Sequence, residues 1–589
     1  MDEFINPSIL QFCTGMVFEA GKVYEGFLFA RLPARTTSGH GTAVVSLTVS
    51  LEDYVSKKTL ATQTLSISTS RTRSHGDAGV SGGFERYNFT LTPSASTNCV
   101  DIAPGSDPTV SCGNGKPRSS IGHTCVRCGG EFKLSLTTAG SAVLVNYVFL
   151  QPGEWGRLAG LPVLKSAADL LKTMGIKAIR QGGSFASSPS DGKAHSPDIT
   201  YYQWEKWTGD AWSRPSRSNG VWKQCLLSGW GIFEMIDMCN ALGIEPVITT
   251  TETDTAEEFA ALVEYCHGDA TTPMGQKRIA DGHPKKYDVK YFELGNEQYN
   301  PNYVEQVAAM EAKARTLGIG NTIHYMFPQN GFLNDSDLAK AAKLTPRIDE
   351  LMVADLHVGG GGAVEQARAL FAKHPDFKMG AVNAETNAGT HTFDRAMSEA
   401  SDLNDWFNAG IASADTANRL HFRAASFCMG DATDFDSWDQ GISFFLPNAT
   451  WLQPPGYVHQ MIDQTWQPNA LNVSATAGGT TILASTLYSA QKSSDGKTLV
   501  LRYVNFGSAT TPAPATNVTV RLKGSRGSVV KTTGAATLWT LESSDGLGAN
   551  PPGNPTLISP KKSTLANFED GTVLHVPSNA YIIVEVTLA

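Results

Sequence analysis

The chain lacks several features that would each have assigned it to a broad class. No apolar run is long enough to cross a bilayer, so no transmembrane helix is expected. Basic residues are in deficit, with 47 Lys and Arg against 56 Asp and Glu. The net charge of −9 argues against nucleic acid or a polyanionic glycan as the main partner. At 589 residues the chain is too long for one core, and two or three domains are expected.

Common nucleotide-, metal- and serine-dependent motifs are also missing. The sequence has no GxSxG elbow, no P-loop and no GxGxxG opening a helix. The stretch VGGGGAVEQ at 358–366 follows a predicted strand but lacks the dinucleotide-binding spacing. His357 and His391 occur without an HxH or HExxH spacing. We therefore predict neither a cofactor nor a metal site.

Cysteine is scarce, with nine in the chain, and four of the nine lie in one polar stretch. Cys99, Cys112, Cys125 and Cys128 would form two disulfides in an oxidising compartment, with the pairing left open. A zinc site is the less favoured alternative, because the first two cysteines are not a CxxC pair. The other five cysteines have apolar neighbours and are predicted to be core residues.

The cellular location is not evident from the N-terminus. MDEFINPSIL lacks the basic and apolar regions of a signal peptide, which taken literally favours the cytoplasm. The cysteine-rich stretch points to secretion instead. Weaker support comes from five Asn-x-Ser/Thr sequons, at Asn88, Asn334, Asn448, Asn472 and Asn517. We expect a secreted glycoprotein whose signal peptide lies upstream of this chain.

Hydrophobic periodicity divides the chain into three regions. Residues 1–155 contain short alternating strands separated by turn residues, which predicts an antiparallel β-sandwich. Residues 156–464 alternate apolar strands with amphipathic helices, which predicts a parallel sheet. Residues 465–589 return to short strands and predict a second β-sandwich. Seven strands are visible in the middle region, a number that suits a (β/α)₈ barrel better than an open sheet.

Catalytic residues of such a barrel are expected at the carboxyl ends of its strands. Two glutamates stand there after apolar strands, Glu297 in YFELGNEQ and Glu385 in AVNAETNAGTH. Two carboxyl groups in one cleft, with Arg180 and His357 nearby, are the apparatus of glycoside hydrolysis. Each glutamate alone could instead be an ordinary capping or ion-paired residue. Both together favour catalysis.

Aromatic residues near these strand ends could form a platform on which a neutral sugar stacks. Trp204 and Trp438 are the candidates we select for substrate binding. Trp207, Trp222 and Trp230 are further tryptophans of the same region, and core packing is expected to account for at least half of the set.

Several motifs together resemble the α-L-arabinofuranosidases of glycoside hydrolase family 51, in the domain order of the eukaryotic members. The resemblance covers about residues 10–589. MVFEAGKVYEGFLFARL is similar to the start of the family's carbohydrate-binding-like sandwich, and FLQPGEWGRLAGLPVLKSAADLLKTMGIKAIRQGGSF to its passage into the barrel. YQWEKWTGDAWSRP, YFELGNEQ, ADLH and PPGYVHQMI resemble later family motifs in the same order.

The resemblance implies a retaining mechanism with Glu297 as general acid/base and Glu385 as nucleophile. Asn296 would hydrogen-bond the sugar 2-hydroxyl, Arg180 would keep the nucleophile ionised, and His357 would line the cleft. The implied substrate is an arabinose-containing polysaccharide or oligosaccharide, and family members often assemble into homo-oligomers. The family's first barrel strand should precede the N-terminal sandwich, and this chain starts too late to contain it.

Two other functions compete with an arabinofuranosidase. A glycosidase of the same clan, such as a β-glucuronidase or an endo-glucanase, would keep the barrel and both glutamates. A carbohydrate-binding protein with a degenerate barrel would account for the missing strand, but it would not need an acid and a nucleophile together. Hydrolysis of an aryl α-L-arabinofuranoside distinguishes the three.

Overall fold

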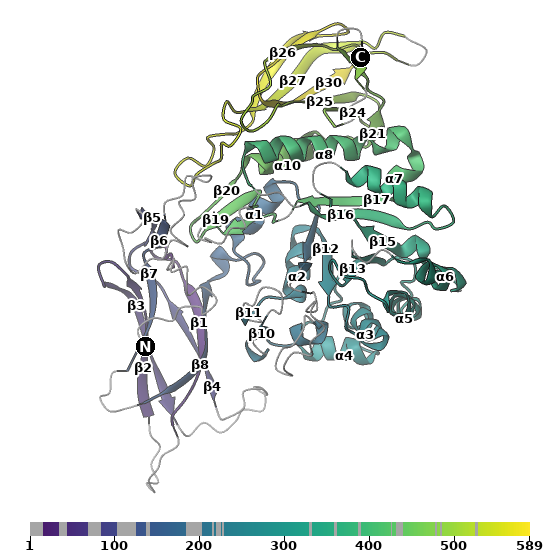
Figure 1. The fold of residues 1–589 in the computed structure, drawn as a ribbon. Coiled ribbons are helices and arrows are strands. Elements are labelled where there is room, and N and C mark those ends of the chain that lie inside the picture. Colours follow the sequence, from purple (N-terminus) through teal and green to yellow (C-terminus); the bar gives the residue numbers. More distant parts are fainter. Residues whose placement is uncertain are drawn as a thin grey trace.

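The computed structural model describes most of the chain. The described residues are 16–33, 44–68, 84–102, 125–136, 142–183, 186, 203–214, 217–218, 225–226, 229–328, 333–344, 346–358, 362–386, 390–425, 427–431, 440–477, 480–482, 486–524 and 528–589. A sandwich of β-strands, a central barrel with its helices, and a second group of β-sheets follow one another along the chain (Figure 1).

Two three-stranded antiparallel sheets form the N-terminal sandwich, in the orders β4-β1-β8 and β3-β2-β7. Alternate residues of the strands, among them Leu28, Val49 and Phe89, bury their side chains between the sheets. This pattern confirms the predicted sandwich. The strands are β1 (Tyr24–Arg31), β2 (Val44–Asp53), β3 (Thr59–Ser68), β4 (Glu85–Leu91), β7 (Gly130–Leu136) and β8 (Leu144–Pro152).

A disulfide joins Cys99 to Cys128 beside this sandwich. The two cysteines face each other across the antiparallel pair β5 (Cys99–Ile102) and β6 (Cys125–Cys128). Cys112 and the side chain of Cys125 lie outside the described part, so the second predicted disulfide stays a prediction. Cys239 and Cys266 are buried free thiols, as predicted for core residues.

The central sheet has seven parallel strands in the order β17-β16-β15-β14-β13-β12-β9. Each strand corresponds to one predicted from the sequence. Inward-facing residues such as Val247, Met326 and Val353 fill the barrel, and their neighbours in sequence pack outward against helices. The strands are β9 (Ala178–Gln181), β12 (Glu245–Thr250), β13 (Tyr291–Leu294), β14 (His324–Phe327), β15 (Met352–Asp355), β16 (Gly380–Thr386) and β17 (Leu420–Ala425).

Helices follow the strands and cover the outside of the sheet (Figure 1). The helix at residues 256–267 begins with a capping box, in which Thr255 Oγ1 accepts from Glu258 N–H and Glu258 Oε2 accepts from Thr255 N–H. The helices are α1 (Lys165–Thr173), α2 (Ile232–Leu242), α3 (Ala256–His267), α4 (Pro273–Ala280), α5 (Tyr303–Thr316), α6 (Asp335–Lys343), α7 (Ala363–Lys373), α8 (Phe393–Ala412), α9 (Ala414–Arg419) and α10 (Pro454–Thr465).

The barrel is nearly closed. β9 and β17 are the edge strands of the sheet, and some of their Cα atoms lie within 8 Å of each other. No strand pairs with both of these edges among the residues that the structure describes. Within the described part of the chain, the expected gap at the position of a first barrel strand lies between β9 and β17.

The C-terminal region contains a six-stranded antiparallel sheet with the order β21-β24-β25-β30-β27-β28. It lies against α8 and α10 (Figure 1). Its strands are β21 (Asn469–Leu471), β24 (Tyr488–Lys492), β25 (Thr498–Asn505), β27 (Thr532–Glu542), β28 (Lys561–Phe568) and β30 (Ala580–Leu588). A second sheet pairs β26 (Thr516–Thr519) with β29 (Val573–Val576).

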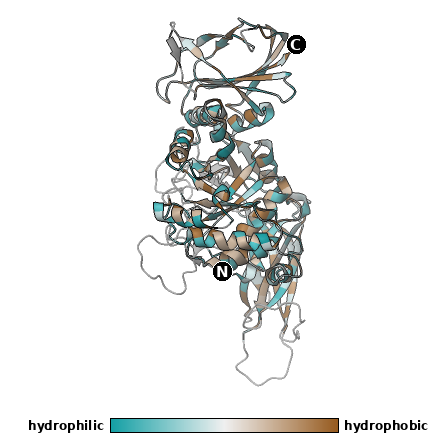
Figure 2. Cartoon of the chain, turned by 90° about the vertical axis from the view of Figure 1, so that its right-hand side faces the viewer, coloured by the Kyte–Doolittle hydropathy of each residue, from teal (hydrophilic) through white to brown (hydrophobic). Residues whose placement is uncertain are grey.

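Hydropathy follows this architecture. The barrel helices carry both hydrophobic and hydrophilic segments, as expected for helices that pack one face on a sheet (Figure 2). Among the described helices, none has the length and apolar character needed to span a bilayer.

Candidate active site

Two glutamates meet at the carboxyl ends of the barrel strands. Glu297 follows β13 and Glu385 lies on β16, and their side chains keep 39% and 22% of their surface exposed. Glu297 adopts a positive φ of 52°, and Gly295 before it has a φ of 99°. A non-glycine residue in this region is uncommon and costs energy, which is typical of functional positions. The turn directs the carboxylate into the barrel mouth.

Arg180 on β9 connects this site to the sheet. Its Nη1 donates to Glu385 Oε2 at 3.1 Å, and its Nη2 donates to Asn296 Oδ1 at 2.6 Å. The guanidinium is almost fully buried, with 8% of the side chain exposed. Asn296 is completely buried, so the ion pair and the amide form one rigid arrangement beside Glu385. The sequence prediction that Arg180 pairs with Glu385 is consistent with this geometry.

His357 lies between the two glutamates. Its Nδ1 is 3.0 Å from Glu297 Oε1 and 3.7 Å from Glu385 Oε2, while its Nε2 is 2.6 Å from Asp355 Oδ2. Burial alone would lower the pKa of His357, but the carboxylates of Asp355 and Glu297 raise it to about 10. The imidazole is therefore positively charged at neutral pH. Its φ of 40° is a second strained position in the site.

The protonated imidazole also affects its partners. The hydrogen bond from His357 lowers the pKa of Glu297 below its ordinary value, against the effect of burial. Burial would raise the pKa of Asp355, but the charge of His357 lowers it. Asp355 Oδ1 accepts from the Ala384 N–H at 2.9 Å, which fixes β15 to β16. His357 is thus held by a buried, ionised acid.

Glu293, which is not among the site residues predicted from the sequence, lies in the same cluster. Its side chain is completely buried inside β13, and both oxygens accept from Arg180, at 2.6 Å from Nε and 2.9 Å from Nη2. Thr249 Oγ1 donates to Glu293 as well. One signal could have found it, since an acid between Phe292 and Leu294 in a buried strand is costly without a cation.

The cluster brings donor atoms close enough to consider a metal ion. One atom from each of Glu297, His357 and Glu385 lies within 4.8 Å of the others, and so does one from each of Glu293, Asp355 and His357. The positive charges of Arg180 and His357 already face these carboxylates. Proton transfer and nucleophilic attack suit this arrangement of paired acids and bases.

The tryptophans considered for sugar binding lie in different surroundings. Trp204 is wrong as a sugar-binding residue, because its indole is completely buried in the barrel core and donates to Glu258 O. Trp207 is buried in the same core. Trp438 lies outside the described residues. Trp230 remains partly exposed, and its Nε1 donates to Gln181 Oε1 at 3.1 Å, next to Arg180. Gln181 is in register with Ile248, whose side chain packs outward, so Trp230 lies on the outer side of the sheet.

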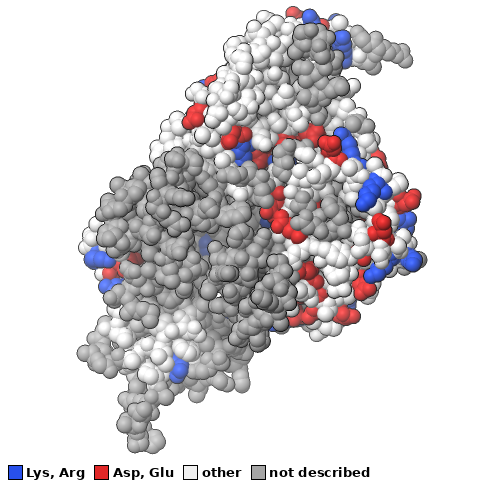
Figure 3. Space-filling view, viewed as in Figure 1, with Lys and Arg blue, Asp and Glu red and all other residues white. Residues whose placement is uncertain are grey.

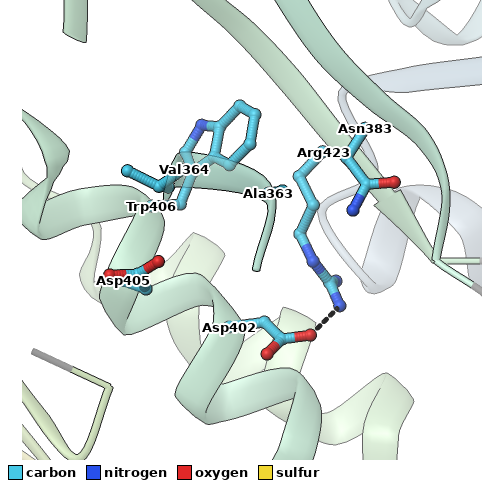
Figure 4. Close-up of a pocket in the computed structure, with 7 residues that line it drawn as sticks. All are labelled: Ala363, Val364, Asn383, Asp402, Asp405, Trp406 and Arg423. Carbon is cyan, nitrogen blue, oxygen red and sulfur yellow. Dashed lines mark hydrogen bonds and ion pairs between the residues drawn. The ribbon is translucent and has the colours of Figure 1, made fainter. Parts of the chain in front are cut away.

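A second group of charges lies on the outer side of the same sheet. A small pocket between α7, α8, β16 and β17 is lined by Asn383, Asp402, Trp406 and Arg423, among others (Figure 4). Arg423 is ion-paired with Asp402 and with the buried Glu399. The pocket is not at the strand ends. On the face seen in Figure 3, acidic side chains gather near the centre of the barrel, and both signs of charge occur at its edge.

Comparisons with known proteins agree with the family resemblance. Residues 170–351 match the model of the alpha-L-arabinofuranosidase 1 domain. Probable alpha-L-arabinofuranosidase C of Aspergillus flavus is 32% identical over 145 residues, which are 24% of this chain and 26% of that protein. Alpha-L-arabinofuranosidase C of Emericella nidulans is 31% identical over 144 residues, with the same shares. The chain thus matches about a quarter of the length of these curated relatives.

Solved structures extend the likeness to the whole fold. An arabinose-bound α-L-arabinofuranosidase of family 51 covers 98% of this chain and 84% of its own, with a TM-score of 0.70 and 16% identity. The α-L-arabinofuranosidase of Thermotoga maritima covers 72% of this chain and 90% of its own, with a TM-score of 0.53 and 18% identity. At these identities the likeness establishes the fold, a barrel with sandwich domains. The predicted fold class is confirmed, and the matched domain and relatives are those that the sequence resemblance indicates.

Proposed function

We propose that this chain is a retaining, exo-acting α-L-arabinofuranosidase of glycoside hydrolase family 51. It releases terminal α-L-arabinofuranosyl residues from the side chains of a polysaccharide or oligosaccharide. The motifs, the family-model match and the fold all favour this activity over that of a β-glucuronidase or an endo-glucanase.

One observation carries the mechanism. Oxygen atoms of Glu297 and Glu385 lie within 4.8 Å of each other, at the open end of the barrel. Retaining glycosidases need their carboxyl groups about 5 Å apart, because one attacks the anomeric carbon directly, whereas inverting enzymes leave room for a water. Glu297 follows β13 and Glu385 lies on β16, with β14 and β15 between these strands in the sheet, and both acids are partly exposed to an incoming sugar.

The roles follow from the partners of each acid. Glu385, paired with Arg180, acts as the nucleophile and forms a covalent bond to the anomeric carbon. Glu297 protonates the leaving oxygen as the glycosidic bond breaks. It then removes a proton from the water that hydrolyses the intermediate. Asn296, oriented by Arg180, hydrogen-bonds the neighbouring sugar hydroxyl.

The acid step requires proton uptake by Glu297. In the geometry described here the proton is on His357, which donates to Glu297 and lowers its pKa. Only the protonated carboxyl can donate to the leaving oxygen, so the fraction of competent enzyme rises as the pH falls towards the pKa of Glu297. We therefore expect an acidic pH optimum.

The decisive experiment is hydrolysis of aryl α-L-arabinofuranosides by the purified chain and by Glu385→Gln and Glu297→Gln. Loss of the nucleophile should reduce kcat at least about 10³-fold on every substrate. Loss of the acid should reduce kcat by about 10²–10⁴-fold for a substrate with a poor leaving group. The reduction should be far smaller for a substrate that releases dinitrophenolate, which needs no proton. Glu264→Gln, which removes the acid of an ion pair with Lys313, is the control and should stay active.

The product distinguishes the remaining alternatives. Proton NMR during turnover should show the α-anomer of arabinose first, as retention requires. Binding of arabinan without turnover by the folded chain would support the carbohydrate-binding alternative. Turnover of a glucuronide or a glucan instead would keep the mechanism and reassign the sugar.

We also propose that the protein is secreted and glycosylated. The Cys99–Cys128 disulfide suits an oxidising compartment. All five sequon asparagines have exposed side chains, which leaves room for a glycan. Recovery of the native protein from the culture medium, with a mass that falls after glycosidase treatment, would support this location. Recovery from the cytosol with a free Cys99 thiol would contradict it.

Assembly into a homo-oligomer is a further proposal and rests on the family resemblance alone. Light scattering on the purified chain decides it, since a monomer has a mass of 63.0 kDa.

A further inference from the structure

We propose that Glu293 is a positioning residue for the glycosidase reaction. Glu293 fixes the orientation of Arg180, and it shares the positive charge of Arg180 with Glu385. The proposal rests on the function proposed above and assigns a role to a buried acid that never touches the sugar.

The surroundings of Glu293 leave it no contact with solvent or substrate. The side chain is completely buried in the barrel interior, two residues before Gly295 on the strand that leads to Glu297. A buried carboxylate is costly unless it is paired and hydrogen-bonded. Here both oxygens are used, by the Nε and Nη2 of Arg180 and by the hydroxyl of Thr249.

The paired geometry determines where the rest of Arg180 points. A guanidinium is planar, so two parallel hydrogen bonds to one carboxylate define both its plane and its rotation. With Nε and Nη2 held by Glu293, the remaining Nη1 lies 3.1 Å from Glu385 Oε2. The same Nη2 also reaches Asn296 Oδ1. Glu293 thereby aligns the donor to the nucleophile and the amide beside it.

Charge sharing is the second part of the role. Burial would lower the pKa of Arg180, but Glu293 is the strongest of the acids that raise it, ahead of Asp355 and Glu385. The other groups of the cluster are Glu297 and the positively charged His357. Arg180 must therefore divide its attraction between Glu293 and Glu385. Removing the charge of Glu293 leaves more of that attraction for Glu385.

Two substitutions separate alignment from charge. Glu293→Gln keeps the size and removes the charge. We expect kcat to fall about 10- to 100-fold with little change in KM, and the acidic limb of the kcat/KM profile to move to lower pH by about 0.5–1 unit. Glu293→Asp keeps the charge but is one methylene shorter. It should lower kcat about 10-fold and leave the acidic limb in place.

Two further variants distinguish a loss of positioning from a loss of folding. Thr249→Val removes one hydrogen bond to Glu293 without touching Arg180, and it should lower kcat a few-fold. Glu264→Gln removes a buried acid of α3 that pairs with Lys313, and it should change thermal stability but neither kcat nor the pH profile.

A readout independent of turnover completes the test. At a fixed pH, the carboxyl ¹³C signal of Glu385 should shift in Glu293→Gln relative to the unmodified chain, because its contact with Arg180 Nη1 changes. If the unmodified chain hydrolyses no arabinofuranoside but this shift appears, the proposed function is wrong and the positioning role stands. The positioning role is overturned if folded Glu293→Gln shows neither the NMR shift nor a change in kcat or the acidic limb. Should Glu293→Gln not fold, unchanged kcat in both Glu293→Asp and Thr249→Val overturns it.

Discussion

The barrel holds two clusters of buried charge, one on each side of the same strands. The inner cluster, at the strand ends, contains Arg180, Glu293 and His357 and leaves Glu297 and Glu385 partly exposed. The outer cluster, between β17 and α8, pairs Glu399 and Asp402 with Arg423 and leaves each side chain at most 9% exposed. Arg395 also pairs with Glu399, at 3.3 Å, and His459 lies 3.7 Å from it.

The two clusters differ in whether their charged side chains remain accessible to substrate. In the outer cluster the charges pair with one another and with backbone carbonyls, and α8 covers most of their surface. In the inner cluster two carboxylates face the barrel mouth, and two residues adopt strained backbone conformations to place them there. Buried charge alone therefore does not mark an active site. An active site is marked by an acid that buried partners hold in place and that remains accessible at the barrel mouth.

The largest effect is expected from a substitution at the centre of the inner cluster. Arg180→Gln leaves Glu293 buried without a cation and Glu385 without its donor. We expect kcat/KM for an aryl arabinofuranoside to fall at least about 10³-fold, because electrostatic support of the nucleophile and its alignment are both lost. Steady-state kinetics measures this effect. Activity within tenfold of the unmodified chain would contradict the role of Arg180.

The outer cluster should respond in the opposite way. Glu399→Gln leaves Arg395 and Arg423 buried with less compensating charge, at a cost of about 3–5 kcal/mol in barrel stability. Arg423 and His459 hold the pKa of Glu399 well below its usual range against the effect of burial. Thermal denaturation should show a lower midpoint. The pH profile of the surviving enzyme should keep its shape, and a shifted limb would show that the two clusters are coupled.

His357→Asn tests the inner cluster through the pH dependence of kcat/KM. The positive charge of His357 lowers the pKa of Glu297, so its removal should raise that pKa. Glu297 would then stay protonated to higher pH, and the basic limb of kcat/KM should move up by about 1 unit, with kcat about 10-fold lower. His283→Asn, which breaks the pair with Asp237 on α2, is the matched control. Its profile should not move.

The smallest effect concerns a buried acid in neither cluster. Burial and the nearby Glu258 raise the pKa of Asp254 to about 7. Because the folded pKa lies above the unfolded value, the folded state loses stability as the pH rises from about 4 through 7. Asp254→Asn should therefore raise the free energy of unfolding by about 1–2 kcal/mol at pH 8 and leave it unchanged near pH 4. Denaturation at both pH values measures it.

Much of the fold was predictable from local patterns. All seven strands predicted for residues 156–464 are present in the barrel sheet. Strand ends of a parallel sheet meet at one edge, so the sequence also predicted that Arg180, Asn296, Glu297, His357 and Glu385 would gather. The Trp204 prediction failed, because an aromatic residue after a strand can turn inward to the core as easily as outward to a sugar.

What the sequence by itself determined is the order of strands and helices and the identity of the acids at the strand ends. Both depend on residue types and spacings within short segments. Only the tertiary structure decided which of those acids stay ionised, which histidine carries the proton, and that Glu293 underlies Arg180. Each of these depends on contacts between strands as much as 205 residues apart in the chain, as between Arg180 and Glu385. No local pattern encodes burial and charge over such separations, because both arise only when the barrel brings the strands together.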